Sequence, residues 1–349
     1  MANPPKLANV LAMMSTPPVD RMDAHSHSTE DAQDVALPGS ELEGKLPSGE
    51  KLEHSYFGTR FASLLAVSLP FIGLIAAIYH WWGTGFTWLH AALLSGMYIL
   101  TAIGVTVGYH RYFTHKSFQT NTVVKVVLGV LGSMSLEGPV IRWVATHRQH
   151  HQHTDRDEDP HTPHAHGKGV VNRIKGAIHS HMGWLFSPAV PAAEVRRYAP
   201  DLVKDKVTSW VDRTTGVWVL VGVAIPTVIA WAVTGTISGA ILGFVWGGLV
   251  RIFFVHHVTW SINSVCHLWG TRPFETHDHS RDNAIFGVLA LGEGWHNTHH
   301  AFPASARQGL RWWQPDVSYY IIWTLGKFGL AHHIRVPDEA RIAAKRRQR

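Results

Sequence analysis

Long apolar runs separated by strongly polar segments dominate the hydrophobic pattern of the chain. Four runs, 61–79, 86–108, 217–234 and 237–258, contain no charged residue except Arg251. Their lengths are close to the roughly 20 residues that a helix needs to cross a bilayer. Within each consecutive pair, only a short uncharged turn separates the two runs. The pattern therefore predicts an all-α membrane protein with two transmembrane helical hairpins, since a soluble four-helix bundle would show amphipathic stripes instead.

The positive charges predict the orientation of these hairpins. Lysine and arginine occur in 1–60, in 109–213 and in 259–349, and Arg251 is the single exception. All three segments lie on the same side of the two hairpins. Lysine and arginine near the ends of spans mark the cytoplasmic face of a membrane protein. We therefore predict a multi-pass protein whose termini and polar, helical domain are all cytoplasmic. Arg251 should face the protein interior or lie beyond the hydrocarbon.

The two ends of the chain differ from the part between them. Residues 1–54 are rich in proline and polar residues, which predicts a disordered arm before a membrane domain at 55–335. Residues 336–349 form a basic tail that would meet anionic lipid headgroups, an acidic redox partner or water. A tail attached to four spans makes nucleic-acid binding a poor explanation. The single cysteine, Cys266, excludes an internal disulfide and a cysteine-based zinc site.

Histidines are unusually frequent, and several follow helical spacing. The segments His-Arg-Gln-His-His at 147–151 and His-Asn-Thr-His-His at 296–300 place histidines at i, i+3 and i+4. Residues at this spacing share one face of a helix. A third cluster begins where the second apolar run ends, and a further histidine follows the fourth run. We expect one site beside the membrane to collect nine of the 26 histidines: His110, His115, His147, His150, His151, His267, His296, His299 and His300.

Nine imidazoles are too many for one metal ion but suit two. Histidine is the commonest metal ligand in proteins. Zinc sites use about four ligands, so a dinuclear zinc hydrolase would be over-supplied with nitrogen, and Glu293 is its only nearby carboxylate base. Nitrogen-rich sites with an open position suit iron that handles oxygen, which favours an oxygen-activating di-iron site. A histidine-rich metal transporter is a more distant alternative, because it would place ionisable ligands in the middle of its spans.

The order of the clusters resembles that of the membrane fatty acid desaturases. His110 to His115, "HRQHH", "NSVCH" and "GEGWHNTHHAFP" follow one another as in the delta-9 type acyl desaturases, and the likeness covers about residues 55–335. The resemblance implies two non-haem irons. One would be held by His110, His151, His267 and His299, with Asn263 acting through a water. The other would be held by His115, His147, His150, His296 and His300. The resemblance also implies that Trp143, Thr259 and Trp260 line the bend of a narrow acyl tunnel.

The implied reaction is oxygen-dependent introduction of a cis double bond into a saturated acyl chain, at the delta-9 position. Dioxygen is the co-substrate and two electrons come from a partner. The chain contains no haem-binding His-Pro-Gly-Gly, no Cys-x-x-Cys pair and no glycine-rich dinucleotide fingerprint. A separate donor is therefore expected, either ferredoxin-like or a b-type cytochrome. A related di-iron hydroxylase or ketolase, which inserts oxygen instead, is the alternative reading of the same histidines.

Departures from the acyl-CoA enzymes bear on the carrier of the acyl chain. Animal acyl-CoA desaturases carry Arg-Asp where this chain has Ala145 and Thr146, and a basic pair where it has Phe186-Ser187-Pro188. Missing cationic donors weaken recognition of a phosphorylated carrier. A membrane lipid is therefore preferred over acyl-CoA as the carrier. Five other cations offer a different route to a phosphate: Arg142, Arg148, Lys168, Arg173 and Lys175.

Overall fold

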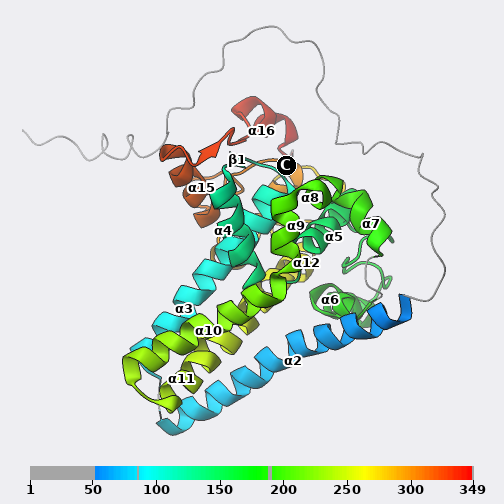
Figure 1. Cartoon of the computed structure of the whole chain (residues 1–349). Coiled ribbons are helices and arrows are strands. Elements are labelled where there is room, and N and C mark those ends of the chain that lie inside the picture. Colours follow the sequence, from blue (N-terminus) through cyan, green and yellow to red (C-terminus); the bar gives the residue numbers. More distant parts are fainter. Residues whose placement is uncertain (1–51, 85, 188–190, 348–349) are drawn as a thin grey trace, which may run out of the picture. The chain divides into compact units, whose positions relative to one another are not determined.

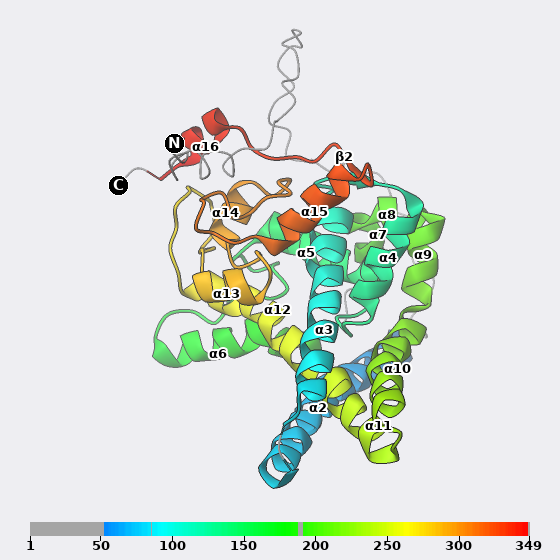
Figure 2. The ribbon, with the colours of Figure 1, turned by 90° about the vertical axis from the view of Figure 1, so that its left-hand side faces the viewer.

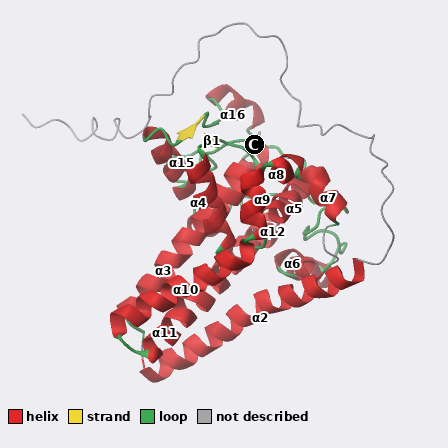
Figure 3. Ribbon diagram, viewed as in Figure 1, coloured by secondary structure: helices red, strands yellow, loops and turns green. Residues whose placement is uncertain are grey.

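The computed structural model describes residues 52–84, 86–187 and 191–347. The chain divides into two compact units, 1–53 and 54–349. The predicted disordered arm, 1–54, lies outside the described residues except for its last three positions. The second unit is almost entirely helical, with one small sheet (Figure 3). That sheet joins β1 (Gln119–Thr120) and β2 (Ala331–His332) in antiparallel pairing.

Four helices of the described residues are long and apolar enough to cross a membrane, which confirms the prediction of four spans. The first hairpin consists of α2 (Leu52–Thr84) and α3 (Trp88–Ile103), which continues as the π-helix η1 (Gly104–Thr114). The second consists of α10 (Thr215–Thr234) and a long helix built from α11 (Ile237–Gly243), η3 (Phe244–Val250) and α12 (Arg251–Leu268). Both hairpin turns lie at the same end of this unit (Figure 1).

The second and fourth spans are longer than the apolar runs that predict them. They end at Thr114 and Leu268 instead of at 108 and 258. The helices continue because backbone hydrogen bonds do not stop at the edge of the hydrocarbon. Each contains a π-helical segment, a feature that often marks functional sites. These extensions carry His110 and His267 beyond the apolar runs and toward the polar domain.

Glycines let the polar domain pack closely against the second span. A Cβ on Gly104 would lie 2.1 Å from the backbone nitrogen of Gly132, and one on Gly108 would lie 2.9 Å from the carbonyl oxygen of Leu128. Both partners belong to α4 (Thr122–Ser133), so this helix lies directly against η1. The remaining helices of the domain are α5 (Val140–His153), α6 (Val170–His181), η2 (Gly183–Phe186), α7 (Ala192–Tyr198), α8 (Pro200–Lys204), α9 (Lys206–Arg213), α13 (Ala284–Leu289), α14 (His296–Ala301), α15 (Val317–Lys327) and α16 (Glu339–Lys345).

Two arginines that sequence analysis singled out hold the fold together. Arg251 is fully buried and donates hydrogen bonds to the carbonyl oxygens of Gly247, Met134 and Gly222, so it faces the protein interior as expected. Arg148 donates to four groups, among them the carbonyl oxygen of Phe113 and both carboxylate oxygens of Asp201. Its guanidinium is engaged within the protein, which removes Arg148 from the phosphate-binding candidates.

The described part of the predicted basic tail packs onto the polar domain. Its helix, α16, follows the loop after β2 and lies beside α14 (Figure 2). Lys345 Nζ donates to the carbonyl oxygen of Ala301 at 2.7 Å, and Glu275 N donates to the carbonyl oxygen of Lys345 at 2.9 Å. Arg347 N donates to the carbonyl oxygen of Pro273. The segment is therefore tied to the end of α14, the helix of His296, His299 and His300.

Candidate metal centre

All nine predicted histidines come together beside the inner ends of the second and fourth spans. They arrive from η1 and the residue after it, from α5, from the end of α12 and from α14. Their ring nitrogens form two groups, and within each group one nitrogen per residue lies within 4.8 Å of all the others. The first group is His110, His115, His147, His151 and His299. The second group is His150, His267, His296 and His300.

This grouping differs from the division that the family resemblance implied. His115 and His147 lie with His110, and His267 lies in the other group. The reason is the geometry of α5 and α14. In each helix the i and i+4 histidines point into one group and the i+3 histidine points into the other, as His147 and His151 do against His150. Spacing places three rings on one face, but it does not say how that face is shared between two sites.

Neighbouring ring nitrogens lie at the separation expected for imidazoles that share a metal ion. His299 Nε2 lies 3.1 Å from His110 Nε2 and 3.0 Å from His151 Nε2. In the second group, neighbouring Nε2 atoms are 3.0 and 3.1 Å apart. Imidazoles on adjacent positions of an octahedral ion, at about 2.1 Å each, would have nitrogens about 3.0 Å apart. His115 Nε2 and His150 Nε2 are buried without any hydrogen-bond partner. The donor set therefore fits a pair of metal ions.

Carboxylates orient four of the rings through the opposite nitrogen, Nδ1. Glu293 lies 2.5 Å from His110, Asp159 lies 3.0 Å from His150, and Asp155 lies 3.1 Å from His267. Asp278 lies 2.8 Å from His300. Such contacts fix the tautomer and the orientation of a metal-binding histidine. Glu158, which lies between Asp155 and Asp159 in the sequence, pairs instead with His153, outside both groups.

Burial favours the neutral form, which is the form that binds metals, in five of the nine rings. Burial lowers the pKa of five of them well below the ordinary value of 6.5: His115, His147, His151, His296 and His299. Burial alone would raise the pKa of Asp155 and Asp159, but the charge of His267 and His150 and the hydrogen bonds from these rings lower it below the usual range. These carboxylates are therefore ionised at neutral pH.

A buried ionic network that sequence analysis missed supports the first group. Arg111 donates to Glu293 Oε1 at 3.1 Å and to Asp316 Oδ1 at 2.8 Å. Asp316 Oδ2 in turn accepts from the backbone nitrogen of Gln308, whose side-chain amide lies 3.3 Å from His299 Nδ1. A Cβ on the residue before Glu293, Gly292, would lie 2.4 Å from Asp316 Oδ1, and its φ of +121° also requires glycine. No spacing rule could have found Gln308 or Asp316.

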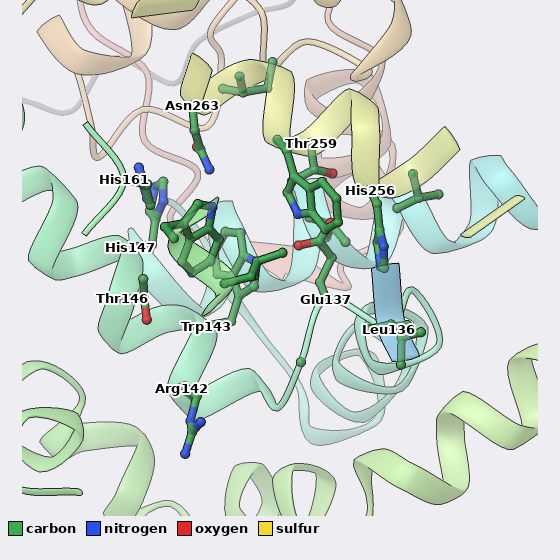
Figure 4. Close-up of a pocket in the computed structure, with 18 of the residues that line it drawn as sticks. Leu136, Glu137, Arg142, Trp143, Thr146, His147, His161, His256, Thr259 and Asn263 are labelled. Carbon is green, nitrogen blue, oxygen red and sulfur yellow. The ribbon is translucent and has the colours of Figure 1, made fainter. Parts of the chain in front are cut away.

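A largely apolar cavity of about 900 Å³ reaches both groups of histidines. His110 and His147 of the first group and His296 of the second line it. The predicted tunnel residues line it too: Trp143 from α5, and Thr259 and Trp260 from α12. Asn263 of α12, which the resemblance assigned to one iron through a water, also lines it. In Figure 4, Trp143 and Thr259 lie on opposite sides of this space, and Asn263 and His147 lie toward one end of it. Trp143 stacks on His147, with ring centroids 5.0 Å apart, so the wall of the cavity is also the wall of the first group.

Two further polar residues, Glu137 and His161, line this cavity. Glu137 lies beside Trp143 and Thr259 (Figure 4). Burial raises its pKa to about 8, against the opposing effect of Trp260, Trp143 and Thr259, so it is neutral at pH 7. His161 is buried, its ring centroid lies 4.4 Å from that of His150, and its Nδ1 has no partner.

Comparison with known proteins identifies relatives of this arrangement. The family model for fatty acid desaturases matches residues 86–335. A hex-5-enoyl-[acyl-carrier protein] acetylenase of Moorena producens is 41% identical over 81% of this chain and 88% of its own length. An acyl-CoA C20 Delta5-desaturase of Anemone leveillei is 34% identical over 90% and 95%. An sn-1 stearoyl-lipid 9-desaturase of Anabaena variabilis is 34% identical over 78% and 94%.

Proposed function

The chain belongs to the fatty acid desaturase family, and we propose that it introduces a cis double bond into a saturated acyl chain at the delta-9 position. The observation that carries the proposal is the apolar cavity of about 900 Å³ that ends against both histidine groups. Such a space fits a hydrocarbon chain held against a pair of metal ions. Support for the bond position comes from the residues Trp143, Thr259 and Trp260 along this cavity and from the 9-desaturase of Anabaena variabilis.

The proposed metals are two irons, one in each histidine group. The donors are neutral imidazoles backed by carboxylates, and nitrogen-rich sites of this kind suit iron that reacts with oxygen. Asn263 lies one helical turn before His267 and lines the cavity, which supports its proposed role through a bridging water. When bound, iron supplies the reductive activation of dioxygen that removal of hydrogen from an unactivated methylene requires.

The protein's own residues supply position and a dry environment. The cavity wall is mainly apolar, so an acyl chain enters it with loss of water from its surface. Trp143 and Thr259 restrict where the chain lies relative to His147, and a fixed orientation of the reacting bond contributes much of an enzyme's advantage. Glu293, Asp155, Asp159 and Asp278 hold the imidazoles in place, so that little rearrangement is needed during turnover.

We propose a membrane lipid as the carrier of the acyl chain. The cavity is bordered by Ala62, Ser63 and Ala66 of the first span and by Thr215 and Val219 of the third, which supports access from the membrane. The relatives named above act, by their names, on chains attached to acyl carrier protein, to coenzyme A and to lipid. The identity with the acetylenase favours acyl carrier protein as the second candidate. Acyl-CoA is the third.

The proposed enzyme works with both termini and the metal centre on the cytoplasmic side and takes electrons from a separate carrier protein. The donor is ferredoxin-like or a b-type cytochrome. A di-iron hydroxylase would use the same histidines, but the relatives named above are desaturases and an acetylenase, which supports removal of hydrogen over insertion of oxygen.

The test is expression in a host that lacks its own desaturase. Lipid classes, coenzyme A esters and acyl carrier protein esters are separated at short times, and double bonds are located by mass spectrometry. A cis monoene that appears first in glycerolipid is the expected result, and first appearance in another pool would replace the proposed carrier. Hydroxylated chains without alkene would overturn desaturation. A ferredoxin and a b-type cytochrome, each with its reductase, are supplied in parallel to separate a missing donor from a missing activity.

A further inference from the structure

Two short helices of the polar domain present uncharged faces to the outside beside the second span. On α13, the exposed fractions of Ile285 and Val288 are 53% and 58%, and that of Leu289 is 45%. The helix contains no charged residue. On α15, Val317, Tyr320 and Trp323 are exposed at a spacing of three, which places them on one face, while Ser318 and Ile322 on the other face are buried.

The loop that precedes α15 adds two exposed tryptophans. Trp312 is 93% exposed and Trp313 is 46% exposed. We call these eight residues of α13, the loop and α15 the interfacial patch. Cations lie at two points of its border: the guanidinium carbon of Arg311 is 5.9 Å from the ring centroid of Trp313, and Lys327 Nζ is 5.3 Å from that of Trp323. Tryptophan, tyrosine and flanking cations at an apolar surface are typical of the boundary between hydrocarbon and headgroups.

Hydrogen bonds fix the height of the patch along the second span. The hydroxyl of Tyr98 donates to the carbonyl oxygen of Leu289 at 2.7 Å, and Ser318 Oγ donates to Thr106 Oγ1 at 2.8 Å. Ser318 N also donates to the carbonyl oxygen of Leu291, which joins the end of α13 to the start of α15. Figure 2 shows α13 beside α12 and α15 beside the upper part of α3.

This height lies within the membrane layer. The span begins at Trp88. At 1.5 Å per residue, Tyr98 lies about 15 Å and Thr106 about 27 Å from its start, along a hydrocarbon core about 30 Å thick. The two groups that Tyr98 and Thr106 contact, in α13 and α15, therefore lie at or inside the hydrocarbon boundary on the side of the polar domain. An uncharged face at this depth has lipid as its natural neighbour.

We infer that the interfacial patch is inserted into the bilayer leaflet on the side of the polar domain, with the acyl chains and the headgroup boundary as its occupant. The chain is thus held in the membrane by α13 and α15 as well as by its four spans. The consequence concerns the metal centre. Only six residues separate α13 from α14, which carries His296, His299 and His300. Asn283, directly before α13, ties the two together: its carbonyl oxygen accepts from the backbone N–H of Gly287, and its own N–H donates to the carbonyl oxygen of Gly294. The inserted patch therefore sets the depth of the α14 histidines.

Spin labels measure this insertion directly. The variants Val288→Cys, Trp312→Cys and Tyr320→Cys are made one at a time in the full chain, where the native Cys266 is buried and does not react. Each nitroxide-labelled protein is reconstituted into phosphatidylcholine vesicles. The accessibility of each label to oxygen, which concentrates in lipid, is compared with its accessibility to a water-soluble nickel chelate. Labels on the exposed residues Leu220→Cys, in the third span, and Lys204→Cys, on α8, give the lipid and water references.

The expected result is an oxygen-to-nickel accessibility ratio at all three patch positions at least threefold above that of the α8 label and close to that of the span label. Ratios equal to that of the α8 label would place the patch in water and overturn the proposal. Low accessibility to both reagents, with spin–spin broadening that disappears on dilution with unlabelled protein, would show that a second copy covers the patch, and would also overturn it. Three independent positions keep the test decisive if one variant does not fold.

Discussion

At the scale of single residues, the two nitrogens of each imidazole divide the work in the metal centre. In seven of the nine rings one nitrogen lies about 3 Å from a nitrogen of a neighbouring ring, and in five of the nine the other nitrogen meets a carboxylate or an amide. Sequence spacing predicts which residues are histidines of the site, but the partner of the second nitrogen comes from elsewhere in the chain. Gln308 and Asp316 reach His299 and Arg111 only because the loop before α15 folds back over α14.

His299→Ala removes the ring whose Nε2 lies 3.0 to 3.1 Å from two others in the first group. We expect loss of at least one of two bound irons and a fall in product of more than about 100-fold, with membrane insertion unchanged. Iron content of the purified protein and product formation in cells are the measurements. His277→Ala, at an exposed histidine outside both groups, is the control and should retain both. Product at wild-type level in the His299 variant would contradict the assignment.

Glu137→Gln tests the neutral carboxyl in the cavity. Burial raises the pKa of Glu137 to about 8. Because the pKa of Glu137 is raised above its unfolded value, its favourable contribution to the free energy of unfolding is complete below about pH 4.5 and is lost as the pH rises through about 8. We expect wild-type activity to fall several-fold between about pH 7 and pH 9, and that of the glutamine variant to fall less, since the amide stays neutral over this window.

The measurement is product formed by each protein in isolated membranes across that pH range, given as the ratio of variant to wild type. This ratio should rise with pH, and it cancels any pH dependence of the electron donor, which both proteins share. A ratio that stays constant from pH 7 to pH 9 would show that Glu137 does not ionise in this window or that its charge has no effect on the bound chain.

At the scale of elements, the hydrophobic pattern predicts the four spans because burial in lipid requires long charge-free runs. It does not predict where the helices end. The second continues to Thr114 as the π-helix η1 and the fourth continues to Leu268 as the α-helix α12, and these extensions carry His110 and His267 into the site. Helical periodicity also predicts one shared face for the histidines of each of α5 and α14. Their division into two groups depends on how the two helices are placed relative to each other, which no local pattern encodes.

Lys345→Met tests whether the C-terminal helix, α16, stabilises the metal centre. Lys345 Nζ donates to the carbonyl oxygen of Ala301, the last residue of α14, and lies 5.5 Å from the ring centroid of Phe302. A hydrogen bond from a charged donor contributes about 1.5 to 3 kcal/mol, and methionine keeps the apolar stem. We therefore expect earlier thermal unfolding and a several-fold faster loss of iron to a chelator. Arg341→Met, at an exposed residue of the same helix, is the control, and equal rates in both variants would contradict the role.

At the scale of the whole molecule, the lysines and arginines lie outside the four apolar runs of the sequence, with Arg251 as the single exception, and Arg251 is buried within the protein, where it donates hydrogen bonds to carbonyl oxygens. The long helices and the polar domain thus separate lipid-facing from water-facing surface along the chain. The distribution of charge predicts which compartment the polar domain faces, because positively charged segments are retained in the cytoplasm.

Thiol labelling of intact cells tests this orientation. Ser238→Cys places an exposed thiol at the start of α11, directly after the turn of the second hairpin, and Lys204→Cys places one on α8 of the polar domain. A membrane-impermeant reagent should label the cysteine at 238 in intact cells and the cysteine at 204 only after the membrane is opened. The wild-type chain, whose Cys266 is buried, gives the background. Labelling at 204 in intact cells would show that the polar domain lies outside the cytoplasm, opposite to the proposed orientation. The enzyme would then need an electron donor outside the cytoplasm, so this result bears on the proposed partner as well as on the topology.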